Sequence, residues 1–246
     1  MNTTHSALIT GASKGFGFSL AEALARQGWR LLINSRNANH LSSAQQQLTK
    51  LTEVIAIPGD VQDESHLQDL SEVLKTNHWQ LDLVINNAST LGVTPLPHLL
   101  TYPVDKIAEV FRTNMIAPVS LLQHIQPYLH PTATLINVSS DAAKEAYEGW
   151  GIYGASKAGL DHMTAVLAAE NPHYHWYAFD PGDMRTGMHQ QAFPGEDISD
   201  RPLPGEVAVP ALLQLIEHPL PNGRYTTTDI LHPQHATHDS LSNHQL

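Results

Sequence analysis

The chain has 246 residues, 15% of them charged, and its 13 lysines and arginines against 24 aspartates and glutamates give a formal net charge of −11. With no basic run in the sequence, this balance argues against nucleic acid or an anionic membrane surface as a partner. The absence of cysteine excludes disulfides, thiolate chemistry and cysteine-based metal sites. No run of eighteen apolar residues occurs and the N-terminal sequence lacks a signal-peptide pattern, so we expect a soluble, cytoplasmic protein.

Short apolar runs alternate with longer helical patterns along the chain. The candidate strands are 6–10, 30–34, 53–57, 81–85, 133–138 and 175–179, and segments of helical length between them include 16–27, 63–77, 104–129 and 153–170. Strands separated by helices pair in parallel, because a tight turn cannot join parallel neighbours. Near-continuous apolar strands fit a sheet that is covered on both faces. The pattern predicts one α/β domain, a doubly wound parallel sheet, over residues 1–231.

Two regions depart from this alternation. Residues 187–205 hold three prolines and little periodicity, which predicts a long loop that acts as a substrate lid, with disorder as the other interpretation. Residues 232–246 form a polar tail with four of the sixteen histidines, and His232, His235 and His238 recur at intervals of three. Because no acidic or cysteine cluster surrounds them, we predict a loosely ordered tail and no metal site.

The stretch TGASKGFG at 10–17 directly follows the first strand and opens a helix. Gly11 permits a tight turn, and Gly15 and Gly17 would let the backbone approach a pyrophosphate at the positive helix N-terminus. The spacing differs from G-x-G-x-x-G, so the glycines alone are weak evidence. Their strand–turn–helix setting predicts a dinucleotide site in a Rossmann-like fold.

The end of the second strand indicates which dinucleotide binds. The strand ends INSRN, with no acid to hold a ribose 2′-hydroxyl, and Arg36 follows Ser35. Lys14, inside the glycine turn, is a second cation near the same ribose. Two cations without a carboxylate favour NADP(H) over NAD(H), unless both are solvated surface charges.

Further segments follow in a fixed order: GDV at 59–61, NNAS at 86–89, NVSS at 137–140, YGASK at 153–157 and DPGDMRT at 180–186. Together with TGASKGFG they resemble the short-chain dehydrogenase/reductase family over about residues 6–231. Tyr153 and Lys157 alone could be an ordinary packing pair on a helix. Their position thirteen residues after Ser140, within this series of motifs, makes the resemblance specific.

The resemblance implies a catalytic set of Asn114, Ser140, Tyr153 and Lys157. Tyr153 would be the acid/base, and an ammonium one helical turn away is expected to lower its pKa. Ser140 would hydrogen-bond the substrate oxygen, with Ser139 as a rival for that role. Asn114 would distort its helix and anchor a water that links Lys157 to solvent, unless it simply faces solvent.

The same resemblance implies the binding residues. Those expected at the cofactor are Gly11, Ser13, Lys14, Gly15, Phe16, Gly17, Ser35, Arg36, Asp60, Val61, Asn87, Ala88, Ser89, Tyr153, Lys157, Pro181, Gly182, Met184 and Thr186. Asp60 and Val61 would meet the adenine. Those expected at the substrate are Ser140, Tyr147, Trp150, Tyr153 and Met188, with the aromatic residues also able to serve only as packing for the lid.

Three residues depart from the family pattern. Ser89 replaces the glycine of the family's NNAG segment. Asp180 directly precedes the Pro-Gly pair and Asp183 directly follows it, and the roles of both are left open. The leading hypothesis is an NADP(H)-dependent oxidoreductase acting on a small-molecule carbonyl/alcohol substrate of medium size. The alternatives are a dehydratase or epimerase of the same fold and a non-catalytic NADP-binding regulator or scaffold. Family members commonly pair through the helices that correspond here to 104–129 and 153–170, so a homodimer or homotetramer is expected.

Overall fold

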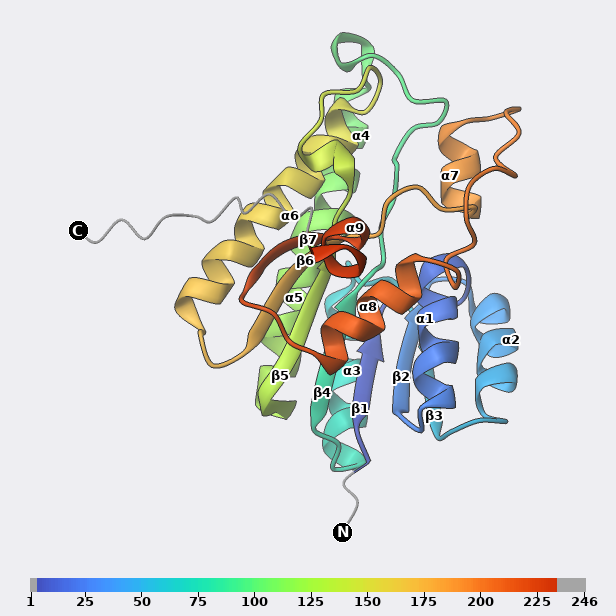
Figure 1. Ribbon diagram of the computed structural model, residues 1–246. Helices are drawn as coiled ribbons and strands as arrows, with labels where there is room; N and C mark the ends of the chain where they lie inside the picture. The colour runs from blue at the N-terminus through green and yellow to red at the C-terminus, as the bar shows by residue number, and fades with distance from the viewer. Residues whose placement is uncertain (1–3, 234–246) are drawn as a thin grey trace, which may run out of the picture.

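In the computed structural model, which describes residues 4–233, the chain forms a single α/β domain around a seven-stranded parallel sheet (Figure 1). The strands are β1 (Ser6–Ile9), β2 (Arg30–Ser35), β3 (Val54–Pro58), β4 (Leu81–Asn86), β5 (Leu129–Val138), β6 (His175–Asp180) and β7 (Gly223–Thr226). They lie in the order β3-β2-β1-β4-β5-β6-β7, and every neighbouring pair is parallel. The predicted doubly wound, Rossmann-like sheet is confirmed.

Helices cover both faces of the sheet. One core contains the inward residues of α1 (Gly15–Arg26), α2 (Ala38–Leu48), α8 (Ala208–Glu217) and α9 (Thr227–Leu231). The other is formed by α3 (Glu64–Thr76), α5 (Ala117–Ile125) and the second half of α6 (Gly151–Glu170). In β1, Ala7 and Ile9 join the first core and Leu8 joins the second. Alternate residues of each strand therefore meet an apolar layer, which explains why the strands are apolar throughout.

The predicted helix over 104–129 is interrupted in the structure. It consists of α4 (Val104–Phe111), a π-helical turn η2 (Arg112–Ile116), α5 and a short 3₁₀ turn η3 (Gln126–Tyr128). Two further 3₁₀ turns, η1 (Leu99–Thr101) and η4 (Asp141–Ala143), lie in the connections. A π turn places one extra residue in the helix, and it occurs around Asn114, the residue expected to distort it.

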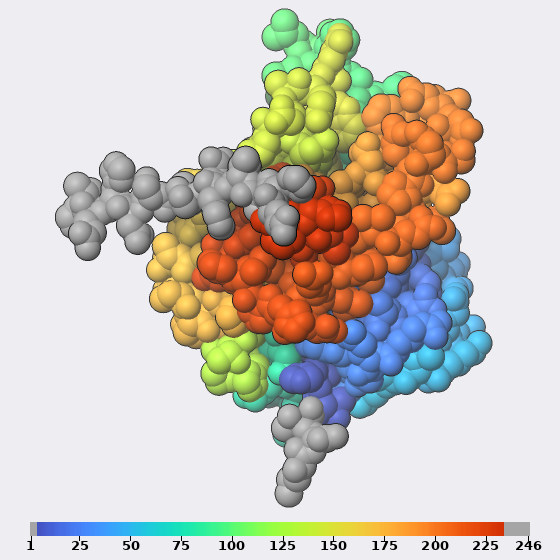
Figure 2. Space-filling model, in the orientation of Figure 1, coloured from blue at the N-terminus to red at the C-terminus, as the bar shows by residue number. Residues whose placement is uncertain are grey.

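The predicted lid at 187–205 is partly helical. It begins with α7 (Gly187–Ala192), whose N-terminus is capped by Thr186, because the Oγ1 of Thr186 accepts from the His189 N–H at 3.2 Å. All three prolines of the segment come after this helix. The loop closes on itself, since the Arg185 N–H donates to the Pro202 carbonyl at 2.8 Å. Figure 2 shows this segment in orange, above the blue helices α1 and α2.

The order of connections reverses between β1 and β4. Chain segments diverge there at the carboxyl ends of the strands, which leaves a crevice at the point where such sheets bind ligands. Among residues 4–233 there is no helix long and apolar enough to cross a membrane, and no group of three or more His, Asp or Glu side chains placed to hold a metal ion. His235 and His238 lie outside the described residues, so the prediction about the tail stays open.

Candidate active site

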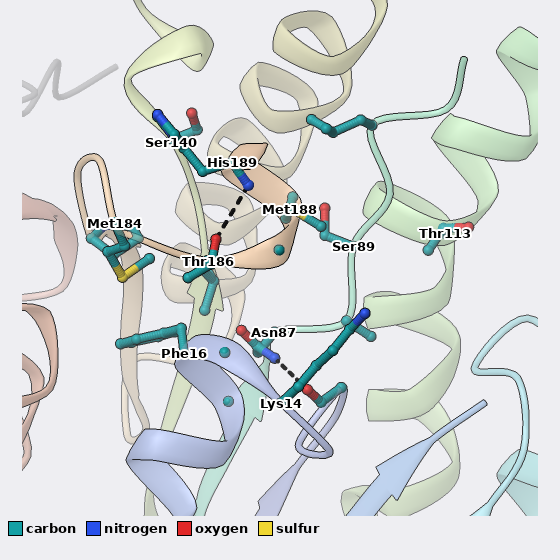
Figure 3. A pocket seen from close by; sticks show the side chains of 18 of the residues that line it. Lys14, Phe16, Asn87, Ser89, Thr113, Ser140, Met184, Thr186, Met188 and His189 are labelled. Atoms are coloured by element: carbon teal, nitrogen blue, oxygen red, sulfur yellow. Dashed lines mark hydrogen bonds between the residues drawn. The ribbon is translucent and has the colours of Figure 1, made fainter. Parts of the chain in front are cut away.

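The glycine turn is tied to the end of β4 by Asn87. Its side-chain amide donates to the carbonyls of Thr10 and Gly11, at 2.8 and 3.2 Å. Gly11 has a φ of +66°, and a Cβ there would lie 2.9 Å from that amide nitrogen. A Cβ on Gly17 would also collide with Asn87, so Gly17 is required for this packing as well as for access to a ligand. Figure 3 shows Asn87 directly opposite the turn that carries Lys14.

Gly15 opens α1 toward the pocket. Its φ is +58°, and the nearest atom to a Cβ there would be the Thr186 side chain, 3.7 Å away. The first turn of α1 has no acidic residue, and Lys14 at its N-cap makes no side-chain cap. The N–H groups of this turn therefore face the cavity without a side-chain acceptor, which is the arrangement that binds phosphate.

The cations predicted for the 2′-phosphate lie at the same end of the cavity. Lys14 and Arg36 are both exposed and both line the pocket. The Ser13 and Ser35 hydroxyls hydrogen-bond each other at 2.8 Å, which joins the glycine turn to the end of β2. Arg36 Nη1 lies 3.8 Å from an Asp60 carboxylate oxygen, a distance that leaves most of its donors free for a ligand.

His66 supports this end of the cavity from below. Its Nε2 lies 2.6 Å from the side-chain nitrogen of Asn34, which also donates to the Gly59 carbonyl at 2.9 Å. Burial lowers the pKa of His66, although the charges of Asp69, Asp63 and Asp60 oppose this shift. The imidazole is thus held neutral, with Nε2 accepting from Asn34.

Asn114 is buried and lies inside the protein rather than on the pocket lining. Its side chain accepts from the Thr90 N–H at 2.8 Å and donates to the Thr90 carbonyl at 2.9 Å. It also donates to the Ser156 hydroxyl on α6 at 3.0 Å and accepts from the Ser89 hydroxyl at 3.0 Å. The alternative that Asn114 faces solvent is wrong, since this side chain clamps the segment after β4 onto α6.

Tyr153 and Lys157 lie one turn apart on α6 and are both buried. Lys157 donates from Nζ to the Val138 carbonyl at 2.7 Å, and this nitrogen lies 5.7 Å from the centre of the Tyr153 ring. Gly154 allows α6 to approach η4 closely, because a Cβ on Gly154 would press on the Ala142 carbonyl. Of the small residues between the pair, Gly154 therefore serves the packing of α6 on η4, whereas Ala155 is exposed and the Ser156 hydroxyl accepts from Asn114.

The pKa of Tyr153 is raised, whereas the sequence led us to expect a lowered one. Burial raises the pKa of Tyr153 to about 12, while hydrogen bonding with Ser140 and Ser89 opposes the rise. Burial also lowers the pKa of Lys157 to about 8, against the charges of Asp161 and Asp180. Loss of hydration is the largest cause of both shifts. Tyr153 consequently holds its proton at neutral pH.

Ser140 follows β5 and lies at the N-terminus of η4. Its hydroxyl donates to Asp141 Oδ1 at 2.9 Å and accepts from the Ala142 N–H at 3.2 Å. Ser139, the rival, is more deeply buried than Ser140, and its hydroxyl has no hydrogen-bond partner in the structure. Both serines line the cavity, and Ser140 is the one whose hydroxyl acts to lower the pKa of Tyr153.

The aromatic residues near the lid have two roles. Trp150 lines the pocket and packs edge-on against Tyr153, with ring centres 5.6 Å apart. Phe193 lies between Trp150, at 6.0 Å, and His189, at 4.8 Å, and so packs the lid onto the body. The prediction that Tyr147 lines the substrate pocket is wrong. Tyr147 is 46% exposed, its hydroxyl donates to Asp141 at 3.0 Å, and it is not part of the pocket lining.

The two unusual aspartates have separate partners. Asp183 lies 3.4 Å from Arg201 Nε and 3.7 Å from His189 Nδ1, so it links the lid to the strand end. Asp180 is buried and accepts from Arg224 Nη2 at 2.7 Å and from the Gly182 N–H at 3.0 Å. Arg224 lies on β7, a strand that was not predicted from the sequence, and the role of Arg224 was not predicted either.

One cavity contains nearly all the predicted binding residues (Figure 3). Every residue predicted at the cofactor lines it, as do four of the substrate set: Ser140, Trp150, Tyr153 and Met188. Asn114 and Tyr147 do not. The cavity is also lined by residues outside the two predicted sets: Asn34, Leu91, Thr113, Val138, Ser139, Asp141, Asp180, Asp183, Gly187 and His189. Several of these directly neighbour a predicted residue in the chain, which is the signal that could have indicated them.

Comparison with known proteins identifies the family. The family profile described as short chain dehydrogenase matches residues 5–197. The chain belongs to the short chain dehydrogenase family. Sepiapterin reductase of Mus musculus is 31% identical over 199 residues, which cover 75% of this chain and 76% of that protein.

Solved structures of short chain dehydrogenases share the fold of this family member. One from Shigella flexneri 2a, complexed with NADP, is 25% identical, with a TM-score of 0.82 and coverage of 91% of this chain and 97% of that one. Another from Escherichia coli CFT073, complexed with NADPH, is 26% identical, with a TM-score of 0.81 and coverage of 91% and 96%.

Proposed function

We propose that this chain is an NADP(H)-dependent oxidoreductase that transfers a hydride between the nicotinamide and a carbonyl/alcohol substrate, with Tyr153 as the acid/base. The observation that carries the proposal is the continuity of one cavity. It runs from Lys14 in the glycine turn and Arg36 after β2 to Ser140 and Tyr153 near the lid. A dinucleotide and a small substrate would therefore share a single site.

The residues present fit NADP(H). The N–H groups at the start of α1 suit the pyrophosphate, and the open side of Gly15 leaves room for it. Lys14 and Arg36 suit a 2′-phosphate, because no acid occupies the end of β2. The NADP and NADPH complexes of the two related structures support the same assignment.

The bound cofactor would supply or accept the hydride, and the protein would supply position and proton transfer. In carbonyl reduction, Tyr153 donates its phenolic proton to the substrate oxygen as negative charge develops there. A raised pKa keeps this proton in place at neutral pH until the substrate oxygen becomes the stronger base. Lys157, one turn away, would then stabilise the phenolate, and its two remaining N–H donors would hold the ribose hydroxyls.

Ser140 would complete the binding of the substrate oxygen. To donate to that oxygen its hydroxyl must turn away from Asp141, to which it donates in the structure. Trp150 and Met188 would provide apolar contacts for the rest of the substrate. The site thus suits a small, partly apolar carbonyl compound.

The test is a screen of carbonyl compounds with purified protein and NADPH, followed at 340 nm, with Tyr153→Phe measured in parallel. We expect NADPH oxidation that depends on a carbonyl compound and on Tyr153. Turnover of a hydroxy compound without net change in NADPH would instead support a dehydratase or epimerase. NADPH binding without turnover of any compound would support a non-catalytic regulator.

The same proposal includes assembly into a homodimer or homotetramer. Ile116 and Val166 are 49% and 42% exposed, and both lie on the helices through which the family commonly pairs. Light scattering coupled to size-exclusion chromatography should give a mass of two or four chains. A single-chain mass would contradict this part of the proposal.

A further inference from the structure

Arg224 on β7 joins three elements behind the catalytic residues. Its Nε donates to Asp161 Oδ2 on α6 at 2.9 Å, and its Nη2 donates to Asp180 Oδ2 at the end of β6 at 2.7 Å. The same Nη2 donates to the main-chain carbonyl of Ser140 at 3.0 Å. The three side chains are 20%, 13% and 6% exposed, for Arg224, Asp161 and Asp180. They form a largely buried cluster, called here the Arg224 cluster.

The contact with Ser140 fixes a catalytic residue from behind. Ser140 lies two residues after Val138, the last residue of β5, where the chain leaves the sheet and enters η4. Its carbonyl accepts from a guanidinium that is itself held by two carboxylates, so the direction of the donor is fixed. The orientation of the Ser140 backbone sets where its hydroxyl points relative to Tyr153.

The charges of the cluster also balance those of the acid/base pair. Lys157 and Arg224 carry two positive charges, and Asp161 and Asp180 carry two negative ones. Asp161 lies one turn after Lys157 on α6, and the charges of Asp161 and Asp180 both act on Lys157. The other groups near the Lys157 ammonium are the Val138 carbonyl and the Tyr153 ring. Removing either carboxylate would leave the buried Lys157 and the largely buried Arg224 with one counter-charge.

We propose that the Arg224 cluster is a positioning unit for the acid/base centre: Arg224 orients Ser140, and Asp161 and Asp180 keep Lys157 in its ammonium form. This inference rests on the proposed function. It assigns a role to residues that touch neither the reacting atoms nor the phosphate turn, and it explains why a carboxylate stands at position 180, directly before Pro181.

A titration of Lys157 tests the electrostatic part without any turnover. The chain has six lysines, so protein labelled at lysine ¹³Cε gives a simple NMR spectrum, in which Lys157→Arg identifies the Lys157 signal. In the cofactor-free protein this signal should titrate at about pH 8, where burial places the pKa of Lys157. Asp161→Asn, which keeps an acceptor for Arg224, should move that midpoint down by about one pH unit. Arg224→Gln should move it up.

The control is Arg26→Gln, which removes an exposed arginine paired with Glu22 and should leave the midpoint unchanged. Asp180→Asn is a second variant for the case in which Asp161→Asn fails to fold. It should also lower the Lys157 midpoint. A Lys157 midpoint that stays at the wild-type value in the folded Asp161 and Asp180 variants would overturn the electrostatic role.

Kinetics test the positioning of Ser140. Arg224→Gln should lower kcat at least tenfold with the best carbonyl substrate while KM for NADPH stays within twofold, and Arg224→Lys should recover part of kcat. A lower melting temperature of Arg224→Gln with an unchanged kcat would overturn the positioning role. If the wild-type protein turns over no carbonyl compound, the proposed function fails, and the NMR titration still decides on the electrostatic role.

Discussion

Lys157 on α6 and Val138, the last residue of β5, are joined by a hydrogen bond of 2.7 Å from Nζ to the main-chain carbonyl. Both residues line the cavity, so this bond fixes the helix with the acid/base pair against the strand end that leads to Ser140. It also occupies a donor of a lysine that is fully buried. The consequences of that burial are the main electrostatic features of the site.

Tyr153→Phe should lower turnover by about 10²- to 10⁴-fold, because the general acid is removed. NADPH affinity should stay within a few-fold, since the phosphate turn is distant from the phenol. Initial rates at 340 nm and NADPH fluorescence titration measure the two effects. Tyr128→Phe, at the opposite end of β5, is the matched control and should keep wild-type rates. Retained activity in Tyr153→Phe would remove its assignment as the acid.

NADPH should raise the melting temperature of the protein more than NADH does at equal concentration, because Lys14 and Arg36 meet the 2′-phosphate. Arg36→Ala should reduce NADPH affinity about tenfold, equivalent to about 1.4 kcal/mol, with little change for NADH. Arg26→Ala, also an exposed arginine in an ion pair, serves as the control. Equal melting-temperature increases for the two cofactors would contradict the role of these cations.

Ser89→Gly, which restores the family residue, should make Tyr153 harder to ionise. The Ser89 hydroxyl donates to Asn114, and its hydrogen bonding lowers the pKa of Tyr153 against the effect of burial. Alcohol oxidation needs the phenolate, so its pH–rate curve should move to higher pH by up to about one unit. Ser71→Ala on α3 is the control. A curve that does not move would show that Ser89 does not act on Tyr153.

The structure also predicts a loss of stability on mild acidification. Burial lowers the pKa of His66, so protonation favours the unfolded chain, where the pKa is near 6.5. The stability from neutral His66 is complete above about pH 6.5 and declines as the pH falls below that value. Melting temperatures between pH 7.5 and 5 should therefore fall less steeply in His66→Gln than in the wild type. His40→Gln, at an exposed position, should keep the wild-type slope. Equal slopes for all three proteins would refute the role of His66.

The sequence predicted the elements whose pattern is local. Six strands and the phosphate turn follow from apolar runs and glycines, and the structure places them within a few residues of the predicted bounds. β7 was missed because only four residues form it and Arg224 interrupts its apolar character. The helix predicted at 104–129 contains a π turn because Asn114 makes tertiary contacts with Thr90 and Ser156, which a single-helix pattern cannot indicate.

In the candidate site, too, the features with a local sequence pattern could be predicted and those that depend on tertiary contacts could not. Residue types and spacing placed Ser140, Tyr153 and Lys157 in one cavity, but they could not give the direction of a pKa shift, which depends on burial by distant segments. Tyr147 was expected at the substrate because it precedes Tyr153, yet a hydrogen bond to Asp141 holds it outside. Asp180 stood out in the sequence, and only the fold shows that its partner is Arg224, 44 residues away.

The most direct test of the proposed chemistry is the fate of a labelled hydride. NADPH deuterated at the transferring position of C4 would be supplied with the best carbonyl substrate from the screen, and the product would be analysed by mass spectrometry. The proposal predicts one deuterium on the carbinol carbon with wild-type protein and no product above background with Tyr153→Phe. A product without deuterium, or equal labelled product from both proteins, would contradict it.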